Sequence, residues 1–168
     1  MNDMIQIKEV QPNELNIIQD IARRTWPVTY GDILSAEQIA YMLERFYSTE
    51  SLNANLDDGH HFLLARENDE MLGFASFVHD QPEKSTTKIP KIYVLPQTQG
   101  KGIGQKLMET IEHQARQHGA KKLTLNVNRF NKALTFYQHL GFEIVAKTDI
   151  NIGRGYLMED YIMEKPLR

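Results

Sequence analysis

The chain has 168 residues, of which 41% are hydrophobic and 24% are charged, so its length suits one sizeable hydrophobic core rather than two. We therefore expect a single domain over residues 1–168. The formal net charge of -3 does not supply the basic face typical of nucleic-acid-binding proteins, and no nucleic-acid partner is predicted. Because the chain contains no cysteine, disulfides, thiolate nucleophiles and thiolate metal sites are excluded, and no metal site is predicted.

The chain starts without the basic leader and apolar segment of a signal peptide, and no apolar run approaches the length of a membrane span. A cytoplasmic protein with no membrane partner is the expectation. No repeat, low-complexity tract or linker divides the sequence, so we expect one continuous series of elements.

The first third of the chain predicts one strand and two helices. Alternation of apolar and polar residues predicts the strand at residues 4–10, and apolar residues at helical spacing predict a helix at residues 11–26. A second helix is predicted at residues 35–48, where Ser35 and Gln38 are spaced as a capping box.

The middle of the chain predicts an antiparallel meander. Its three strands are expected at residues 60–67, 70–80 and 88–96, and Asn68 and Asp69 supply the turn between the first two. An apolar stripe then marks the most regular helix, and Gly119 stands where its C-terminal cap belongs. The last elements expected are this helix at 102–119, a strand at 121–128, a helix at 131–141 and strands at 142–150 and 156–165. The order βααβββαβαββ indicates an α+β fold with a mixed sheet.

Gly100, Gly102 and Gly104 lie between a strand and this regular helix. Free N–H groups and the positive end of the helix dipole at this point favour an anion, and glycine lets the backbone approach a phosphate closely. An ordinary turn is the alternative. A P-loop would require glycine in place of Leu95, and a dinucleotide fingerprint would require glycine or alanine in place of Leu107, so neither motif fits.

The stretch Gln99-x-x-Gly102-x-Gly104 after "IYVLP" instead resembles the acetyl-CoA loop of the GNAT superfamily of N-acetyltransferases. Residues 126–142, "NVNRFNKALTFYQHLGF", are similar to the second signature of that superfamily. The predicted order of elements resembles its fold, a mostly antiparallel sheet with helices on both faces. The members of the second signature are Asn131, Ala133, Phe136, Tyr137, Gly141 and Phe142.

The resemblance implies a site for acetyl-CoA as cosubstrate. In the resembling enzymes the strand before the loop splays from its neighbour and binds the pantetheine arm, while the loop binds the pyrophosphate. Lys101 is alternatively a solvated loop residue, and Asn131 is alternatively, or in addition, a helix N-cap. The implied cofactor-binding residues are Ile92, Tyr93, Val94, Gln99, Gly100, Lys101, Gly102, Ile103, Gly104, Gln105 and Asn131.

The resemblance also places Tyr137 near the sulfur of the coenzyme, where its phenol would protonate the departing thiolate. Packing in the core is the alternative role of this tyrosine. Many relatives carry a catalytic carboxylate on the strand before the loop, but "STTKIPKIYV" contains no acid. His79, Asp160 or a water held by such groups are the candidates for the general base.

The segment between the first two helices resembles that of a bacterial branch that includes polyamine (spermidine/spermine) acetyltransferases. Trp26, Tyr30 and Asp32 offer aromatic faces and a carboxylate to a cationic amine, although the two aromatic residues alternatively hold the helix pair together. We therefore expect an acetyl-CoA-dependent N-acetyltransferase that modifies a primary amine directly, possibly a small polycation. A peptide or protein N-terminal acetyltransferase and a non-catalytic acyl-CoA sensor are the alternatives, and pairing of the last strand would form a homodimer.

Overall fold

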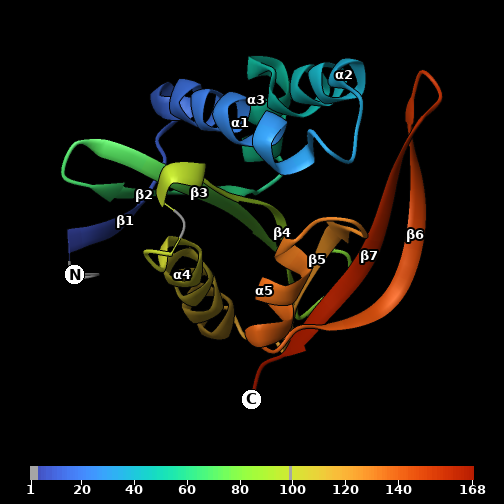
Figure 1. The fold of residues 1–168 in the computed structure, drawn as a ribbon. Helices are drawn as coiled ribbons and strands as arrows, with labels where there is room; N and C mark the ends of the chain where they lie inside the picture. The colour runs from blue at the N-terminus through green and yellow to red at the C-terminus, as the bar shows by residue number, and fades with distance from the viewer. Residues whose placement is uncertain (1–3, 99) are drawn as a thin grey trace.

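The structure, a computed structural model, describes residues 4–98 and 100–168 (Figure 1). The predicted α+β class is confirmed, with one helix more than the sequence indicated. None of the described helices is long and apolar enough to cross a membrane. The elements are β1 (Ile5–Glu9), the 3-10 turn η2 (Pro12–Glu14), α1 (Leu15–Tyr30), α2 (Ala36–Tyr47), α3 (Thr49–Asp57), β2 (His61–Glu67), β3 (Glu70–His79), β4 (Thr86–Val94), the 3-10 turn η3 (Pro96–Thr98), α4 (Ile103–Gln117), β5 (Lys122–Asn128), α5 (Ala133–His139), β6 (Glu143–Gly153) and β7 (Tyr156–Pro166).

Helix α3 is the element that the sequence did not predict. It begins after Ser48, whose hydroxyl accepts a hydrogen bond from the backbone N–H of Ser51 at 3.1 Å. Leu52 is its one buried residue, so the helix lacks the apolar stripe by which the other helices are recognised. Its stability depends on the N-cap and on packing against the rest of the protein.

Helix α1 runs further than its predicted end at residue 26. It continues through Pro27 to Tyr30, although proline removes a helical hydrogen bond and usually ends a helix. The rings of Trp26 and Tyr30 lie 4.7 Å apart on this last turn, and both side chains are buried. Tertiary packing of these two rings therefore offsets the unfavourable proline.

The seven strands form one sheet in the order β1-β2-β3-β4-β5-β7-β6. All neighbours are antiparallel except β4 and β5, which are parallel. The last strand in the sequence, β7, pairs with β5 on one side and β6 on the other. The dimer through the last strand stays a prediction, and since β7 is paired on both sides from Asp160 to Glu164, only its first residues, 156–159, lack a partner on β5.

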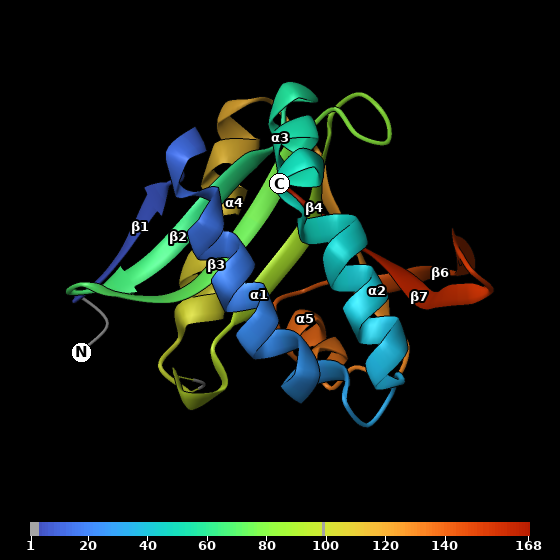
Figure 2. The same cartoon turned by 90° about the horizontal axis from the view of Figure 1, so that it is seen from above.

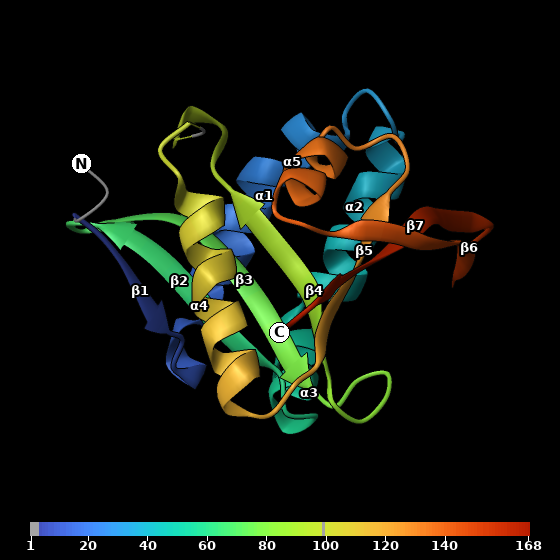
Figure 3. The ribbon, with the colours of Figure 1, turned by 90° about the horizontal axis from the view of Figure 1, so that it is seen from below.

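Helices cover both faces of the sheet, as predicted. Figure 2 shows α1, α2 and α3 over one face, and Figure 3 shows α4 and α5 on the other. The first layer packs around Ile18, Leu52 and Phe74, and the second around Leu107 and Phe142. The apolar stripe of α4 predicted from its spacing is buried throughout.

The sheet opens in its middle, between β4 and β5. The two strands pair only from Thr86 to Ile89 on β4, whereas β4 stays paired with β3 as far as Val94. A bulge on β4 places Ile89 and Pro90 opposite the single residue Phe77, and Pro90 has no N–H to donate across the sheet. Bulges bend the strand that carries them, and the two strands diverge from this point toward α5 (Figure 3).

Candidate active site

The open half of β4 presents unpaired main-chain groups to the gap. In an antiparallel pair, every second residue directs its N–H and C=O toward the partner strand. Leu95 donates its N–H to the carbonyl of Leu72 at 2.8 Å, so Tyr93, two residues earlier, also bonds toward β3. The main-chain groups of Ile92 and Val94 therefore face the gap, where an extended ligand could pair with them as a strand would.

The glycine loop follows β4 and leads into α4. Gly100 and Gly102 adopt φ values of 91° and 75°, in the left-handed region that favours glycine, and α4 begins at Ile103. The first N–H groups of an α-helix have no acceptor in a preceding turn, and they point out of the helix at its positive end. The loop can thus receive an anionic group, as the sequence predicted. The predicted contact of Gln99 lies outside the described residues.

The third glycine of the loop has a packing role. A Cβ atom added to Gly104 would lie 3.1 Å from the ring carbon Cζ of Phe136 on α5. The missing side chain therefore lets α5 approach the first turn of α4. This contact holds α5 beside the loop.

Two polar side chains of the loop region point to solvent. Lys101 is exposed, and its Nζ lies 3.7 Å from Oε1 of Glu67. Gln105 is exposed and donates a hydrogen bond to Oε1 of Glu109 at 3.2 Å. Such exposed pairs contribute little to stability, so both side chains can reorient toward a ligand at small cost.

Helix α5 carries Tyr137, which belongs to the core cluster against which Ile92 and Val94 of β4 pack. The side chain is buried, and its ring contacts those of Phe136 and Phe142. Burial raises the pKa of the Tyr137 phenol well above its usual value, with a smaller effect from Tyr30. The phenol is therefore fully protonated at neutral pH. Asn131 lies one residue before Lys132, the N-cap of α5, and its Oδ1 accepts the N–H of Ala133, the first helical residue, at 2.9 Å.

A cavity of about 280 Å³ lies between α1, α2 and the open half of the sheet. The hydroxyls of Tyr30 and Tyr93 are 2.8 Å apart in its wall, and burial raises the pKa of Tyr30 to about 12. The side chains lining the cavity come from six elements and from the turn between α1 and α2. They are Trp26, Tyr30, Leu34, Met42, Phe46, Tyr47, Lys88, Pro90, Lys91, Tyr93, Asn126, Asn128, Ile150, Leu157, Met158 and Asp160.

Asp160 is the one carboxylate in this lining. It lies on β7 opposite Asn128 of β5, and only 3% of its surface is exposed. Burial raises the pKa of the Asp160 carboxyl, while the side chain of Asn126 and the positive charge of Arg129 lower it by less. A carboxylate held in this way is a stronger base than one in water.

His79 and Asp32, both predicted for the site, do not line this cavity. His79 shares a hydrogen bond of 3.0 Å with Oγ1 of Thr87, and its ring stacks on His118 with the ring centres 4.0 Å apart. His118 follows the C-terminal end of α4, whereas the glycine loop precedes the N-terminal end. Asp32 is exposed in the turn after α1. Neither residue is therefore placed to act on a molecule in this cavity.

The cavity also contains polar residues that the sequence did not single out. Lys91 comes two residues before Tyr93, and alternation along β4 places both side chains on one face. Asn126 and Asn128 share a face of β5 for the same reason. Strand periodicity could have indicated that the two residues of each pair share a face. It could not have indicated which residues of other elements lie opposite them across the cavity.

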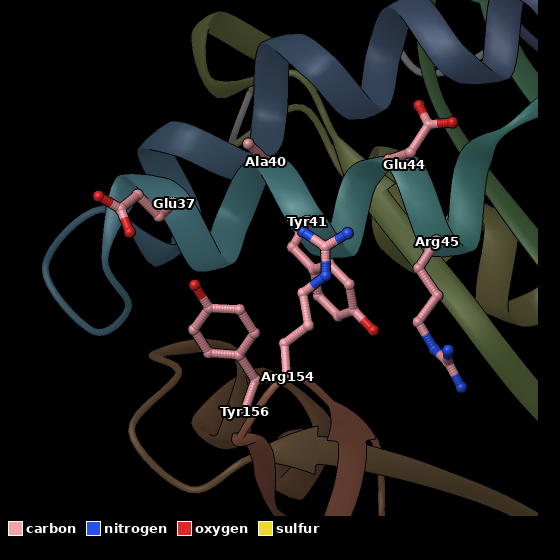
Figure 4. A pocket seen from close by; sticks show the side chains of 7 residues that line it. All are labelled: Glu37, Ala40, Tyr41, Glu44, Arg45, Arg154 and Tyr156. Carbon is pink, nitrogen blue, oxygen red and sulfur yellow. The ribbon is translucent and has the colours of Figure 1, made fainter.

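A second, open hollow of about 670 Å³ lies between α2 and the hairpin of β6 and β7 (Figure 4). The hydroxyl of Tyr41 donates a 2.6 Å hydrogen bond to the carbonyl of Ile152, and the guanidinium of Arg154 lies 5.1 Å from the ring centre of Tyr41. The ring of Tyr156 is 5.4 Å from the same ring. These contacts attach the hairpin to α2, and both elements contribute to the wall of the 280 Å³ cavity.

Comparison with known proteins identifies the family. Residues 15–142 match the Acetyltransferase (GNAT) family. An uncharacterised N-acetyltransferase of Mycobacterium tuberculosis is 28% identical over 149 residues, which cover 88% of this chain and 94% of the relative. The spermidine N(1)-acetyltransferase of Thermoplasma acidophilum is 28% identical over 169 residues, covering 96% of each chain.

A solved structure agrees with this match. The PaiA N-acetyltransferase of Thermoplasma acidophilum, determined in complex with coenzyme A, superimposes with a TM-score of 0.81 at 25% identity. The superposition covers 97% of this chain and 99% of that one. With the family matched over most of the sequence and the fold matched over nearly all of it, the chain belongs to the GNAT family and is an N-acetyltransferase that uses acetyl-CoA.

Proposed function

We propose that the protein transfers an acetyl group directly from acetyl-CoA to the primary amine of a small molecule that enters the cavity between α1, α2 and the sheet. The observation that carries this proposal is the gap between β4 and β5, which joins the glycine loop to that cavity. Main-chain groups of Ile92 and Val94 face the gap, Tyr137 belongs to the core cluster against which these two residues pack, and Asp160 lines the cavity.

The residues around the gap suit the parts of acetyl-CoA in order. The N–H groups of Gly102, Ile103 and Gly104 at the start of α4 suit the pyrophosphate, whereas the N–H of Lys101 already donates to the carbonyl of Thr98. The side chain of Lys101 can add a positive charge there. Ile92 and Val94 would pair with the amide groups of the pantetheine arm, and Asn131 would contact the same arm. When bound, acetyl-CoA supplies an activated acetyl group as a thioester.

In this proposal Asp160 prepares the amine. A primary alkyl amine with a pKa of about 10.4 is neutral in only roughly one molecule in 2,500 at pH 7, so a base must remove a proton before attack. Asp160 is the one carboxylate lining the cavity, and its raised pKa suits it to accept that proton directly or through a water molecule.

Tyr137 completes the proton balance. Because its phenol stays protonated at neutral pH, it can donate a proton to the sulfur as the bond between carbon and sulfur breaks. The ammonium group of the acceptor loses two protons in forming an amide. One goes to Asp160, and the other replaces the proton that Tyr137 has given up.

The acceptor class was left open by the sequence. A polyamine is supported by the aromatic faces of Trp26 and Tyr30, by the carboxylate of Asp160, and by the name of the Thermoplasma acidophilum spermidine acetyltransferase. A peptide N-terminus would use the same cofactor site. The direct test is to mix the protein with acetyl-CoA and a panel of amines and to measure the release of free thiol. Binding of acetyl-CoA without thiol release from any amine would favour the acyl-CoA sensor instead.

The loop itself is tested by Gly102→Glu with Gly102→Ala as its matched control. Both variants place a side chain at a φ of 75° and share that backbone strain, but only the first adds a negative charge beside the proposed pyrophosphate site. We expect Gly102→Glu to raise the Kd for acetyl-CoA about 10-fold or more above that of Gly102→Ala, measured by calorimetry. Equal Kd values in the two variants would show that the loop does not hold the phosphates.

A further inference from the structure

Two lysines line the 280 Å³ cavity, and they lie on different halves of β4. Lys88 is paired with Thr124 of β5, so it lies where the sheet is closed. Lys91 comes after Ile89, the last residue of β4 that pairs with β5, so it lies on the open half. It directly precedes Ile92, whose main-chain groups face the gap. Of the two lysines, Lys91 is therefore the one beside the proposed path of the pantetheine arm.

The amino group of Lys91 is held loosely. Its Nζ lies 5.3 Å from the centre of the Tyr47 ring on α2 and 3.3 Å from Oδ1 of Asn55 on α3. Among the described residues, no carboxylate forms an ion pair with it. The hydrogen bond to Asn55 is longer than usual, and the four-carbon stem of a lysine is flexible. The amino group can therefore move within the cavity at small cost.

The same amino group loses its proton more readily than that of an ordinary lysine. Burial, with repulsion from Lys88, lowers the pKa of Lys91 to about 8. An amine with this pKa is neutral in roughly one molecule in ten at pH 7, compared with roughly one in 2,500 for a lysine in water. Because only the neutral amine is a nucleophile, Lys91 has about 200 times more of the reactive form than an exposed lysine.

We propose that Lys91 is a site of self-acetylation, which receives the acetyl group of acetyl-CoA bound to the same molecule when no amine acceptor occupies the cavity. This inference rests on the proposed function, because that function places the thioester between the gap and the cavity. The neutral amine attacks the thioester carbon, so an amide C–N bond forms as the C–S bond breaks. The nitrogen loses one proton and the thiol of CoA gains one, so no further reactant is needed.

Acetylation of Lys91 would change the cavity in two ways. It would remove a positive charge from the lining, and it would add an acetyl group within a volume of about 280 Å³. The longer side chain would take up space that an acceptor needs. Incubation with acetyl-CoA alone should therefore lower the turnover measured afterwards, and an acceptor present from the start should prevent this loss.

The test incubates the protein with acetyl-CoA alone and maps the acetylated lysines by mass spectrometry. We expect Lys91 to be modified about 10-fold or more faster than Lys88, the matched control in the same cavity, and than the exposed Lys84. The rate constant should not change with protein concentration, because the transfer takes place within one molecule. Lys91→Arg should abolish the modification at this position, since a guanidinium stays protonated, whereas Lys84→Arg should leave the rate at Lys91 unchanged.

Site mapping and turnover are separate readouts. Modification of Lys91 without acetylation of any amine in the panel would support this inference and would refute the proposed function alone. Acetylation of amines by a protein whose Lys91 stays unmodified in their absence would overturn this inference alone, and the absence of both reactions would overturn both. Acetylation spread evenly over Lys84, Lys88 and Lys91, or a rate constant that rises with protein concentration, would also overturn this inference.

Discussion

Replacing Tyr137 with phenylalanine is expected to lower kcat about 100-fold or more, because the reaction loses its positioned proton donor. The variant removes one oxygen from a ring that packs between Phe136 and Phe142, so Tm should change little. The Kd for acetyl-CoA should stay within about twofold of the parent, since the phenol is assigned to the sulfur and not to the phosphates. Thiol release under saturating substrates measures kcat, and calorimetry measures Kd.

The matched control for this variant is Tyr156→Phe. Tyr156 lies in the hollow beside Tyr41, on the β6–β7 hairpin, and its loss of a hydroxyl should leave kcat unchanged. If Tyr137→Phe turns over as fast as this control, the proton donor lies elsewhere and Tyr137 serves only to pack α5.

Asp160→Asn should lower kcat/KM for the amine about 100-fold or more and at the same time raise Tm at neutral pH. The carboxylate is the proposed base, so activity falls. Its pKa is raised in the folded protein because burial disfavours its charge, so removing the charge relieves that cost. An opposite change in activity and stability is a signature that a simple packing defect would not produce.

The pH dependence of Tm tests whether the charge of Asp160 destabilises the folded protein. Because the pKa of Asp160 is raised in the folded state, the folded protein holds this proton more tightly than the unfolded chain does. Ionisation of Asp160 therefore destabilises the fold as pH rises from the unfolded pKa, about 3.9, through the folded pKa. The Tm advantage of Asp160→Asn over the parent should therefore grow through this window and level off above it. Asp32→Asn, at an exposed aspartate outside the cavity, is the control and should show no such trend. Full turnover by Asp160→Asn would exclude Asp160 as the base.

Much of the fold could be predicted from the sequence because its signals are local. The buried stripe of α4 follows from helical spacing, and the anion-binding character of its N-terminus follows from Gly100 and Gly102 before it. The signature around Tyr137 likewise combines residues within one short segment. Helix α3 escaped prediction because a single buried leucine does not make a periodic pattern.

Which of the candidate residues line the proposed amine-binding cavity depends on tertiary structure alone. His79 and Asp160 were both candidates for the general base in the sequence. Only the insertion of β7 between β5 and β6 brings Asp160 opposite Asn128, while His79 stays beside His118. The surroundings of Lys91 are likewise tertiary. Its Nζ lies near the aromatic ring of Tyr47 on α2 and the side-chain amide of Asn55 on α3, two helices that lie far from it in the sequence. The burial, the charge compensation and the pKa of a side chain depend on the residues that lie across the cavity from it. Strand order and helix packing determine those neighbours, and no local sequence pattern encodes either of them.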